Sequence, residues 1–258
     1  MGNLGKVLSD KHVIVTGAGK GIGAAIVDTL AAEGAKVTLM GRSLAPLQEK
    51  VLQLPQAQAI AVDVTQSDRI KAAFQQARAA FGHIDILINN AGQASTSPAH
   101  KIDDDHWDQM IAVNLSSVFY CCREALADML ESGGGRIINI ASTAALKGYG
   151  YVAAYCAAKH GTLGLTRSLA LETATKNITV NAVCPGYTET ELVQNSIKTI
   201  MEKTGRSEAE ARAELTQSNP QGRLVQPEDV ANAVLWLCSP GSEAVTGQAI
   251  AVAGGEVM

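Results

Sequence analysis

Hydrophobic positions follow two alternating patterns along the chain. Short continuous runs rich in valine and isoleucine predict strands over residues 12–16, 36–40, 58–62, 85–89, 136–140, 179–183 and 248–252. Because these runs are continuous, they are typical of strands buried on both faces of a sheet. Between them, apolar residues recur every three or four positions, as at Ile22, Ile26 and Leu30, which predicts helices with one buried face.

The alternation of strand and helix over almost the whole chain predicts the α/β class. We expect a seven-stranded parallel, doubly wound sheet with helices on both faces. Seven strands in 258 residues leave no room for a separate substrate domain, so residues 1–258 are expected to form one domain. Its active site would then lie at the carboxyl edge of the sheet.

Residues 188–226 interrupt the regular alternation, because this stretch contains no predicted strand. It includes Ser207-Glu208-Ala209-Glu210, a capping-box pattern before a polar, alanine-rich helix. A long insertion of this kind predicts a lid or binding loop over the substrate. A surface excursion without a role is the alternative.

Composition and charge exclude several classes of protein. The chain has 21 Lys and Arg against 25 Asp and Glu, a net charge of −4, and 47% hydrophobic residues. These values argue against nucleic acid or an anionic membrane as the partner, and against disorder. Apolar stretches are too short for a membrane helix and the N-terminus lacks a signal-peptide pattern, so we expect a cytoplasmic protein.

The sequence predicts neither a disulfide framework nor a metal site. Its five cysteines are odd in number and form no C-x-x-C motif, and we interpret them as small buried residues. The acidic run Asp103-Asp104-Asp105 is interpreted as the N-terminus of a helix, because adjacent carboxylates on a helix point apart and favour its positive end.

A glycine-rich turn follows the first predicted strand and leads directly into a helix. Its sequence is Thr16-Gly17-Ala18-Gly19-Lys20-Gly21-Ile22-Gly23. Glycines permit a tight turn and a close approach of backbone amides to a pyrophosphate, which the helix N-terminus also favours. Placed between a strand and a helix, the turn predicts dinucleotide binding in a single-domain Rossmann fold. The expected contacts are Gly17, Gly19, Lys20, Gly21, Ile22 and Gly23.

The end of the second predicted strand distinguishes between two cofactors. An NAD site would offer Asp or Glu to the adenosine ribose, but the chain has Met40-Gly41-Arg42-Ser43 there. The Arg42 guanidinium suits a 2′-phosphate, with the Ser43 hydroxyl nearby and Lys20 as a second cation. We therefore expect NADP(H), with NAD(H) possible if Arg42 is only a solvated surface residue. Asp63 and Val64 are expected beside the adenine.

Further candidate residues follow later strand ends, where ligands of parallel sheets collect. They are Asn90, Ala91 and Gly92 after the fourth strand, Ser142 after the fifth, and residues 185–190 after the sixth. Tyr155 and Lys159 lie four apart on a predicted helix and present their side chains on one face. We expect a tyrosine, a lysine and a serine to converge on one pocket.

These residue types suit the reduction of a ketone, which needs a hydride and a proton for the developing alkoxide. A phenol is a poor proton partner at neutral pH unless cations lower its pKa, so Lys159 would stabilise the Tyr155 phenolate. The Ser142 hydroxyl would bind the carbonyl oxygen. Asn114, near a helix start or kink, could hold a water that passes protons to Lys159. Structural alternatives remain open: Ser142 could cap the next segment, and Asn114 could bond its own backbone.

Over essentially its whole length the chain resembles the short-chain dehydrogenase/reductases. The matching motifs are Thr16-Gly17-x-x-x-Gly21-x-Gly23, Asn89-Asn90-Ala91-Gly92, Asn114, Ser142, Tyr155-x-x-x-Lys159 and Pro185-Gly186. The resemblance implies a catalytic tetrad of Asn114, Ser142, Tyr155 and Lys159, the last also holding the nicotinamide ribose. It further implies that Thr188 and Thr190 contact the cofactor, and that the protein is a homotetramer.

Within that family, residues 135–143, 178–186 and 222–227 look closest to β-ketoacyl-thioester reductases, including polyketide-type ketoreductases and hydroxyacyl-CoA dehydrogenases. The predicted substrate is a 3-oxoacyl thioester or a similar ketone. Alternatives are an NAD-linked dehydrogenase of a small hydroxy acid or of a cyclic or aromatic alcohol, and a catalytically silent dinucleotide sensor. Gly41, in place of an acidic residue, weakens the assignment to NAD-linked hydroxybutyrate dehydrogenases. The expected substrate-lining residues are Ala94, Ala144, Tyr149, Tyr151 and Tyr187.

Overall fold

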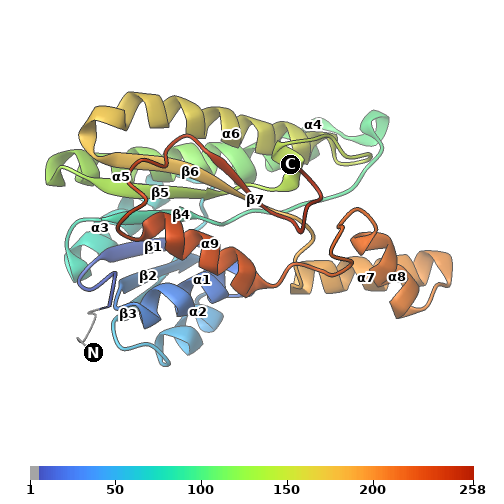
Figure 1. The fold of residues 1–258 in the computed structure, drawn as a ribbon, viewed down its shortest axis with the longest axis horizontal. Coiled ribbons are helices and arrows are strands. Elements are labelled where there is room, and N and C mark those ends of the chain that lie inside the picture. The colour runs from blue at the N-terminus through green and yellow to red at the C-terminus, as the bar shows by residue number, and fades with distance from the viewer. Residues whose placement is uncertain (1–5) are drawn as a thin grey trace.

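One sheet runs through the molecule with helices on both sides (Figure 1). The computed structural model describes residues 6–258, so the first five residues of the expected domain lie outside the described part. The strands are β1 (His12–Thr16), β2 (Lys36–Gly41), β3 (Ala57–Ala61), β4 (Ile86–Asn89), β5 (Gly135–Ile140), β6 (Ile178–Pro185) and β7 (Ala249–Val252). The seven predicted strands are confirmed, with small differences at their ends.

The strand order places a crevice at the carboxyl ends of β1 and β4. The sheet runs β3-β2-β1-β4-β5-β6-β7, and every neighbouring pair is parallel. From β1 the chain first winds outward through β2 and β3, and then continues in the opposite direction from β4. The doubly wound prediction is therefore confirmed. Ligands of such sheets bind at this reversal, so the active site is still expected there.

Helices cover both faces, and each face has its own apolar core. The helices are α1 (Gly21–Ala32), α2 (Leu44–Val51), α3 (Ser67–Phe81), α4 (Asp104–Ile111), α5 (Ser117–Ser132), α6 (Ala153–Thr173), α7 (Glu191–Thr204), α8 (Glu208–Thr216) and α9 (Pro227–Cys238). In β1, Val13 and Val15 pack in the cluster that contains α1 and α9, whereas Ile14 packs in the cluster that contains α3 and α5. Burial on both faces explains why the strand sequences are continuous apolar runs.

Helices α7 and α8 extend beyond the carboxyl edge of the sheet (Figure 1). The predicted capping box is confirmed, since Ser207 Oγ accepts a hydrogen bond from the Glu210 amide and the Glu210 carboxylate accepts one from the Ser207 amide at 2.8 Å. A small apolar cluster joins the two helices: Val193, Ile197, Ala211, Leu215 and Leu224. Between residues 188 and 226 the only strand-like pairing is a single bridge from Thr188 to Val225.

Two interpretations of polar and sulfur-containing residues are confirmed. Asp103 is the N-cap of α4, and its carboxylate accepts a hydrogen bond from the His106 amide at 2.8 Å. The cysteines are free thiols, of which Cys156 alone is partly exposed. Within residues 6–258 there is no cluster of three or more His, Cys, Asp or Glu side chains that could hold a metal. In the same range, each helix is too short or too polar to cross a membrane.

Candidate active site

The glycine turn passes too close to its surroundings for larger residues. Gly17 and Gly21 have φ values of 64° and 56°, which strain residues with a Cβ. A Cβ on Gly17 would lie 2.9 Å from the Ala91 Cα, and one on Gly23 would lie 2.2 Å from the Gly17 carbonyl oxygen. Gly19 has more room, with its nearest neighbour 3.5 Å away. The bare backbone at the start of α1 forms a cradle that fits a pyrophosphate.

Hydrogen bonds fix the loop after β4 against this turn. Asn90 donates from Nδ2 to the carbonyl oxygens of Thr16 and Gly17, each at 3.0 Å. In return, Thr16 Oγ1 accepts hydrogen bonds from the amides of Asn90 and Ala91, also at 3.0 Å. Thr16 was not predicted as a site residue, although its place directly before Gly17 was a usable signal. These contacts fix the position of the loop after β4 relative to the glycine turn after β1.

The residues expected at the adenosine end lie around the ends of β2 and β3. Arg42 and Ser43 directly follow β2 and are exposed. Asp63 follows β3, and hydrogen bonds from Thr65 hold the pKa of its carboxyl below the usual range, with a smaller effect of the Arg42 charge. Val64 is buried in the core. The exposed side chains of Arg42 and Ser43 therefore lie at the expected adenosine end of the site.

Lys20 and Thr190 connect the glycine turn with the start of α7. The Lys20 ammonium forms an ion pair with Glu191, and both side chains are exposed. The Thr190 methyl group would lie 3.2 Å from a Cβ on Gly21. Ile22 packs from the first turn of α1 against the core. The predicted cofactor residues in the turn between β1 and α1 therefore lie next to those that follow β6.

The segment after β6 is fixed by its own backbone contacts. Pro185 is the last residue of β6, and the Gly186 amide donates to the Val252 carbonyl oxygen at 3.1 Å. Thr188 is buried, and its hydroxyl donates to the Gly186 carbonyl oxygen at 3.0 Å. This turn directs the chain from the sheet edge towards α7.

Asn114 is fully buried in a five-residue π-helical segment, Ala112–Ser116, between α4 and α5. Its Nδ2 donates to the carbonyl oxygens of Gln93 at 2.9 Å and Met110 at 3.1 Å, and its Oδ1 accepts from the Gln93 amide at 3.2 Å. The Asn114 carbonyl oxygen accepts from Thr162 Oγ1 at 2.8 Å. The predicted kink is present, and the Asn114 side chain bonds the backbone of Met110 one turn earlier and of Gln93 in the segment after β4.

Ser142 and Tyr155 contact each other at the carboxyl end of β5. The Ser142 hydroxyl accepts a hydrogen bond from the Ala144 amide at 3.1 Å, so this residue does cap the next turn. The Ser142 side chain also lies near enough to Tyr155 to affect the pKa of the phenol. Burial raises the pKa of Tyr155 to about 12, and the Ser142 hydroxyl opposes that effect. Without a cofactor, burial therefore outweighs the pKa lowering that the sequence led us to expect.

Lys159 completes the group from the next turn of α6. Its Nζ donates to the Ile140 carbonyl oxygen at 2.8 Å and lies 5.8 Å from the centre of the Tyr155 ring. Burial lowers the pKa of Lys159 to about 8. A Cβ on Gly92 would lie 3.6 Å from Lys159 Nζ and 2.9 Å from Asn114 Oδ1, so this glycine keeps space open between those side chains.

The five residues expected to line the substrate site differ widely in exposure. Ala144 is buried, Ala94 is exposed, and Tyr151 is exposed with a φ of 66°. Tyr149 donates its hydroxyl to Glu256 at 2.6 Å and also contacts the Thr143 hydroxyl at 2.7 Å. Tyr187 is exposed, and burial of its hydroxyl raises its pKa above the usual value.

Besides Thr16, sequence reasoning missed Thr162 and Glu256 at this edge. Thr162 lies three positions after Lys159, so helical spacing was a usable signal for it. Glu256 had none, because nothing local in the sequence indicates that the chain end returns to this edge.

A family model described as short chain dehydrogenase matches residues 11–200. The chain belongs to the short-chain dehydrogenase family. This short-chain dehydrogenase is 37% identical over 249 residues to the 3-oxoacyl-[acyl-carrier-protein] reductase of Escherichia coli (strain K12). The alignment covers 96% of this chain and 98% of that protein. The chain is 38% identical over 248 residues to the D-beta-hydroxybutyrate dehydrogenase of Cupriavidus necator, covering 93% of this chain and 95% of the relative.

A solved structure gives the same result for the fold. The crystal structure of a variant actinorhodin polyketide ketoreductase with NADPH matches this short-chain dehydrogenase with a TM-score of 0.92 and 36% identity, covering 96% of this chain and 98% of that one. The predicted family is therefore confirmed, including its ketoacyl-reductase likeness. The protein is a nicotinamide-dependent oxidoreductase, as the sequence indicated.

Proposed function

We propose that this short-chain dehydrogenase interconverts a ketone and a secondary alcohol with NADP(H) as its preferred cofactor. The observation that carries the proposal is the convergence of Ser142, Tyr155 and Lys159 beside the glycine cradle. When bound, the nicotinamide supplies or accepts the hydride. The residues that would hold the cofactor are Gly17, Gly19, Lys20, Gly21, Ile22, Gly23, Arg42, Ser43, Asp63, Val64, Asn90, Ala91, Gly92, Tyr155, Lys159, Pro185, Gly186, Thr188 and Thr190.

Tyr155 would donate the proton that a developing alkoxide requires. Its side chain lies close to that of Ser142, so a carbonyl oxygen placed between the two hydroxyls would have two hydrogen-bond partners. Lys159 keeps a pKa of about 8 and is therefore mostly protonated at neutral pH, although it is buried. Its positive charge near the ring would stabilise the phenolate as the proton leaves.

Asn114 would hold a water that returns protons to Lys159. The open space beside Gly92 borders both the Asn114 side-chain oxygen and Lys159 Nζ, which supports this role. The backbone hydrogen bonds from Gln93 and to Met110 would keep the asparagine in place. The proposal thus uses all four residues of the tetrad.

Arg42 would select NADP(H) by pairing with the 2′-phosphate. Replacing Arg42 with Asp is expected to lower the ratio of kcat/KM for NADPH to that for NADH by about tenfold or more, because attraction becomes repulsion. Steady-state kinetics with both cofactors measures this ratio. Arg69→Asp is the control, since Arg69 is also exposed and also acts on Asp63 without lying after β2. An unchanged ratio in the Arg42 variant would remove the role given to Arg42.

The substrate class that we favour is a 3-oxoacyl thioester. By their names, two of the relatives above act on a 3-oxoacyl group and on beta-hydroxybutyrate, and the third is a polyketide ketoreductase. We assign the same ketone chemistry to this chain. The proposal includes a single catalytic domain with residues 188–226 as its lid, and a homotetramer. It also includes a cytoplasmic location, where the five free thiols would stay reduced.

The proposal is tested by assaying acetoacetyl-CoA, a cyclic ketone and an aromatic ketone with NADPH and with NADH. We expect NADPH-dependent reduction, with acetoacetyl-CoA the best of the three. Tyr155→Phe should lower turnover by about 10³-fold while cofactor binding, followed by fluorescence, persists. Near-normal turnover in that variant would refute the assignment. Tight cofactor binding without turnover of any ketone or alcohol would instead favour the catalytically silent sensor.

A further inference from the structure

The chain end returns to the catalytic edge after β7. Gly254 and Gly255 have φ values of 61° and 93°, and the Glu256 amide donates to the Ala253 carbonyl oxygen at 3.1 Å, which forms a tight turn. A Cβ on Gly254 would lie only 2.1 Å from the Asn219 Oδ1. This close packing leaves the turn little freedom and directs the Glu256 side chain inward.

Three donors surround the Glu256 carboxylate, whose side chain is 2% exposed. Its Oε1 accepts hydrogen bonds from the Tyr149 hydroxyl at 2.6 Å and the Ser218 hydroxyl at 2.9 Å, and it pairs with Lys147 Nζ at 3.1 Å. The other oxygen would lie 3.1 Å from a Cβ on Gly186. One carboxylate therefore joins the loop after β5, the segment after α8 and the turn after β6.

Hydrogen-bond directions link this carboxylate to the neighbour of Ser142. A carboxylate only accepts, so the Tyr149 hydroxyl must donate its single proton to Glu256. The Tyr149 oxygen is then free to accept from Thr143 Oγ1, 2.7 Å away. Thr143 directly follows Ser142. The orientation of Tyr149 is therefore set from the chain end.

The charge of Glu256 also affects the pKa of the nearby Tyr187. Burial would raise the pKa of Glu256, but the bonds from Tyr149, Ser218 and Lys147 outweigh it and hold the pKa below the usual range, so the group is ionised. Its negative charge contributes to the raised pKa of Tyr187, although burial contributes more there.

We propose that Glu256 is a specificity-determining positioning residue that fixes Tyr149 and disfavours substrates with a free carboxylate. Glu256 disfavours such substrates because it pairs with the Lys147 ammonium. Without Glu256, that ammonium would be available to bind a substrate carboxylate beside Tyr149. A neutral ester or thioester meets no such penalty. The inference rests on the proposed function, because it names the charge state of the ketone that the same site accepts.

The test compares acetoacetate with ethyl acetoacetate, which share the ketone and differ in charge. The wild-type protein should prefer the ester in kcat/KM. In Glu256→Gln, Lys147 is released and the ester-to-acid ratio should fall about tenfold, the effect of one unit charge close to the ligand. Lys147→Met should move the ratio in the opposite direction, and Glu256→Asp, which keeps the charge, should leave it near the wild-type value.

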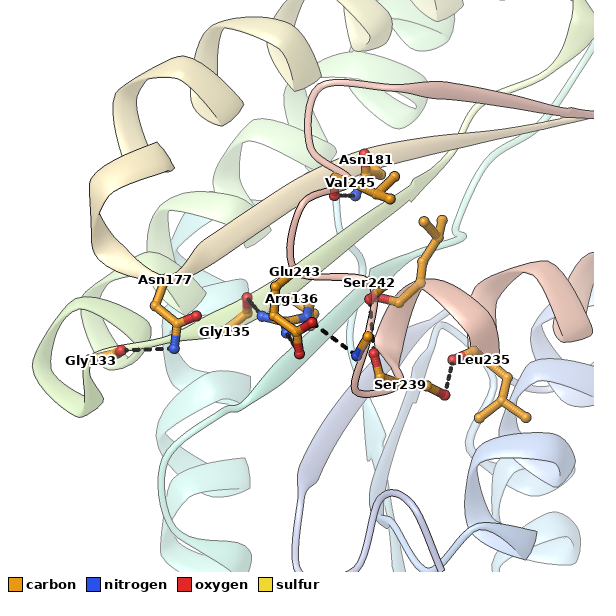
Figure 2. A network of polar contacts seen from close by, with 12 residues as sticks. Gly133, Gly135, Arg136, Asn177, Asn181, Leu235, Ser239, Ser242, Glu243 and Val245 are labelled. Atoms are coloured by element: carbon orange, nitrogen blue, oxygen red, sulfur yellow. Dashed lines mark hydrogen bonds and ion pairs between the residues drawn. The ribbon is translucent and has the colours of Figure 1, made fainter.

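Glu243 offers a matched control at the opposite end of the sheet. Figure 2 shows Glu243 beside Arg136, and the two side chains pair at 3.4 Å where β5 begins. The Glu243 carboxylate also accepts a hydrogen bond from the Gly241 amide at 2.9 Å. Glu243→Gln thus makes the same chemical change before β7 that Glu256→Gln makes after it. We expect it to leave the ester-to-acid ratio unchanged.

A purely structural role for Glu256 would lower the activity on both compounds equally, and an unchanged ratio in Glu256→Gln would refute the proposal. So would an equal shift in Glu243→Gln. Calorimetric binding of the two compounds to the protein saturated with NADP⁺ gives the same ratio without turnover. If the wild-type protein reduces no ketone, the proposed function fails, whereas the binding ratio still decides the role of Glu256.

Discussion

The two sides of the catalytic edge are held together in different ways. On the side of β1, β4 and α6, buried groups fix one another, as where Thr16 and Asn90 exchange bonds and Lys159 bonds the end of β5. On the side of α7 and α8, the two helices share a small apolar cluster, and their polar contacts include exposed ion pairs such as Arg206 with Glu214. Buried contacts hold one geometry, whereas exposed pairs each stabilise little. The residues proposed to carry the reaction thus lie on the side held by buried contacts, the rigid side, whereas the proposed covering segment, residues 188–226, lies on the other side.

The largest effect is expected where the rigid side depends on backbone spacing. Gly23→Ala would place a Cβ 2.2 Å from the Gly17 carbonyl oxygen, and that backbone cannot yield without moving the turn. We expect cofactor affinity to fall by about 100-fold or more, measured by fluorescence titration. Gly164→Ala is the control, because nothing lies within 4 Å of its Cβ and this glycine is outside the proposed cofactor site. Equal losses in both variants would show that the spacing argument is wrong.

A second test removes a buried charge pair on the rigid side. Asp128 accepts from Arg78 Nε at 2.8 Å and from the Ile84 amide at 3.0 Å, and it is buried between α3 and α5. Asp128→Ala leaves both donors without this acceptor, so we expect a loss of about 3 kcal/mol in the free energy of unfolding. Chemical denaturation measures it. A loss below about 1 kcal/mol would mean that water replaces the carboxylate at little cost.

Lys159 gives a third test, in which a catalytic group costs stability. Its pKa is about 8 in the folded protein and near 10.5 when unfolded, so below pH 8 the folded state holds a charge that burial disfavours. Between pH 8 and 10.5 the unfolded state binds more protons, and stability rises with pH. Lys159→Met lacks this cost, so it should be more stable than wild type by about 2 kcal/mol at pH 7, with the difference shrinking towards pH 10.5. A difference independent of pH in thermal melts would contradict this explanation.

The rigid side is also the side that the sequence describes well. Continuous apolar runs such as residues 12–16 predict strands because both faces are buried, and the glycine turn is predictable because its chemistry is contained in eight consecutive residues. Asn114 is predictable as a kink for the same local reason. The π-helical form of that kink was not, since it depends on Gln93 and Thr162, which lie far away in the sequence.

The contacts of Glu256 show where sequence reasoning ends. Glu256 reaches Tyr149 across more than a hundred residues, and no periodic pattern encodes such a contact. The raised pKa of Tyr155 was not predictable either. It depends on how deeply the phenol is buried, which many distant residues determine, and not on the spacing between Tyr155 and Lys159. Residue types and their spacing therefore predict which groups could react, whereas contacts between distant residues determine the pKa values and orientations of those groups.

The smallest effect is expected for the exposed pair between Arg206 and Glu214, whose side chains are each about half exposed. Glu214→Gln should change the free energy of unfolding by less than about 0.5 kcal/mol, because water solvates both groups and salt screens their attraction. Thermal melts in low and high salt measure the change, which should disappear as the salt concentration rises. A loss as large as that of Asp128→Ala would mean that the pair anchors the covering segment rigidly, and the two sides of the edge would then not differ as argued.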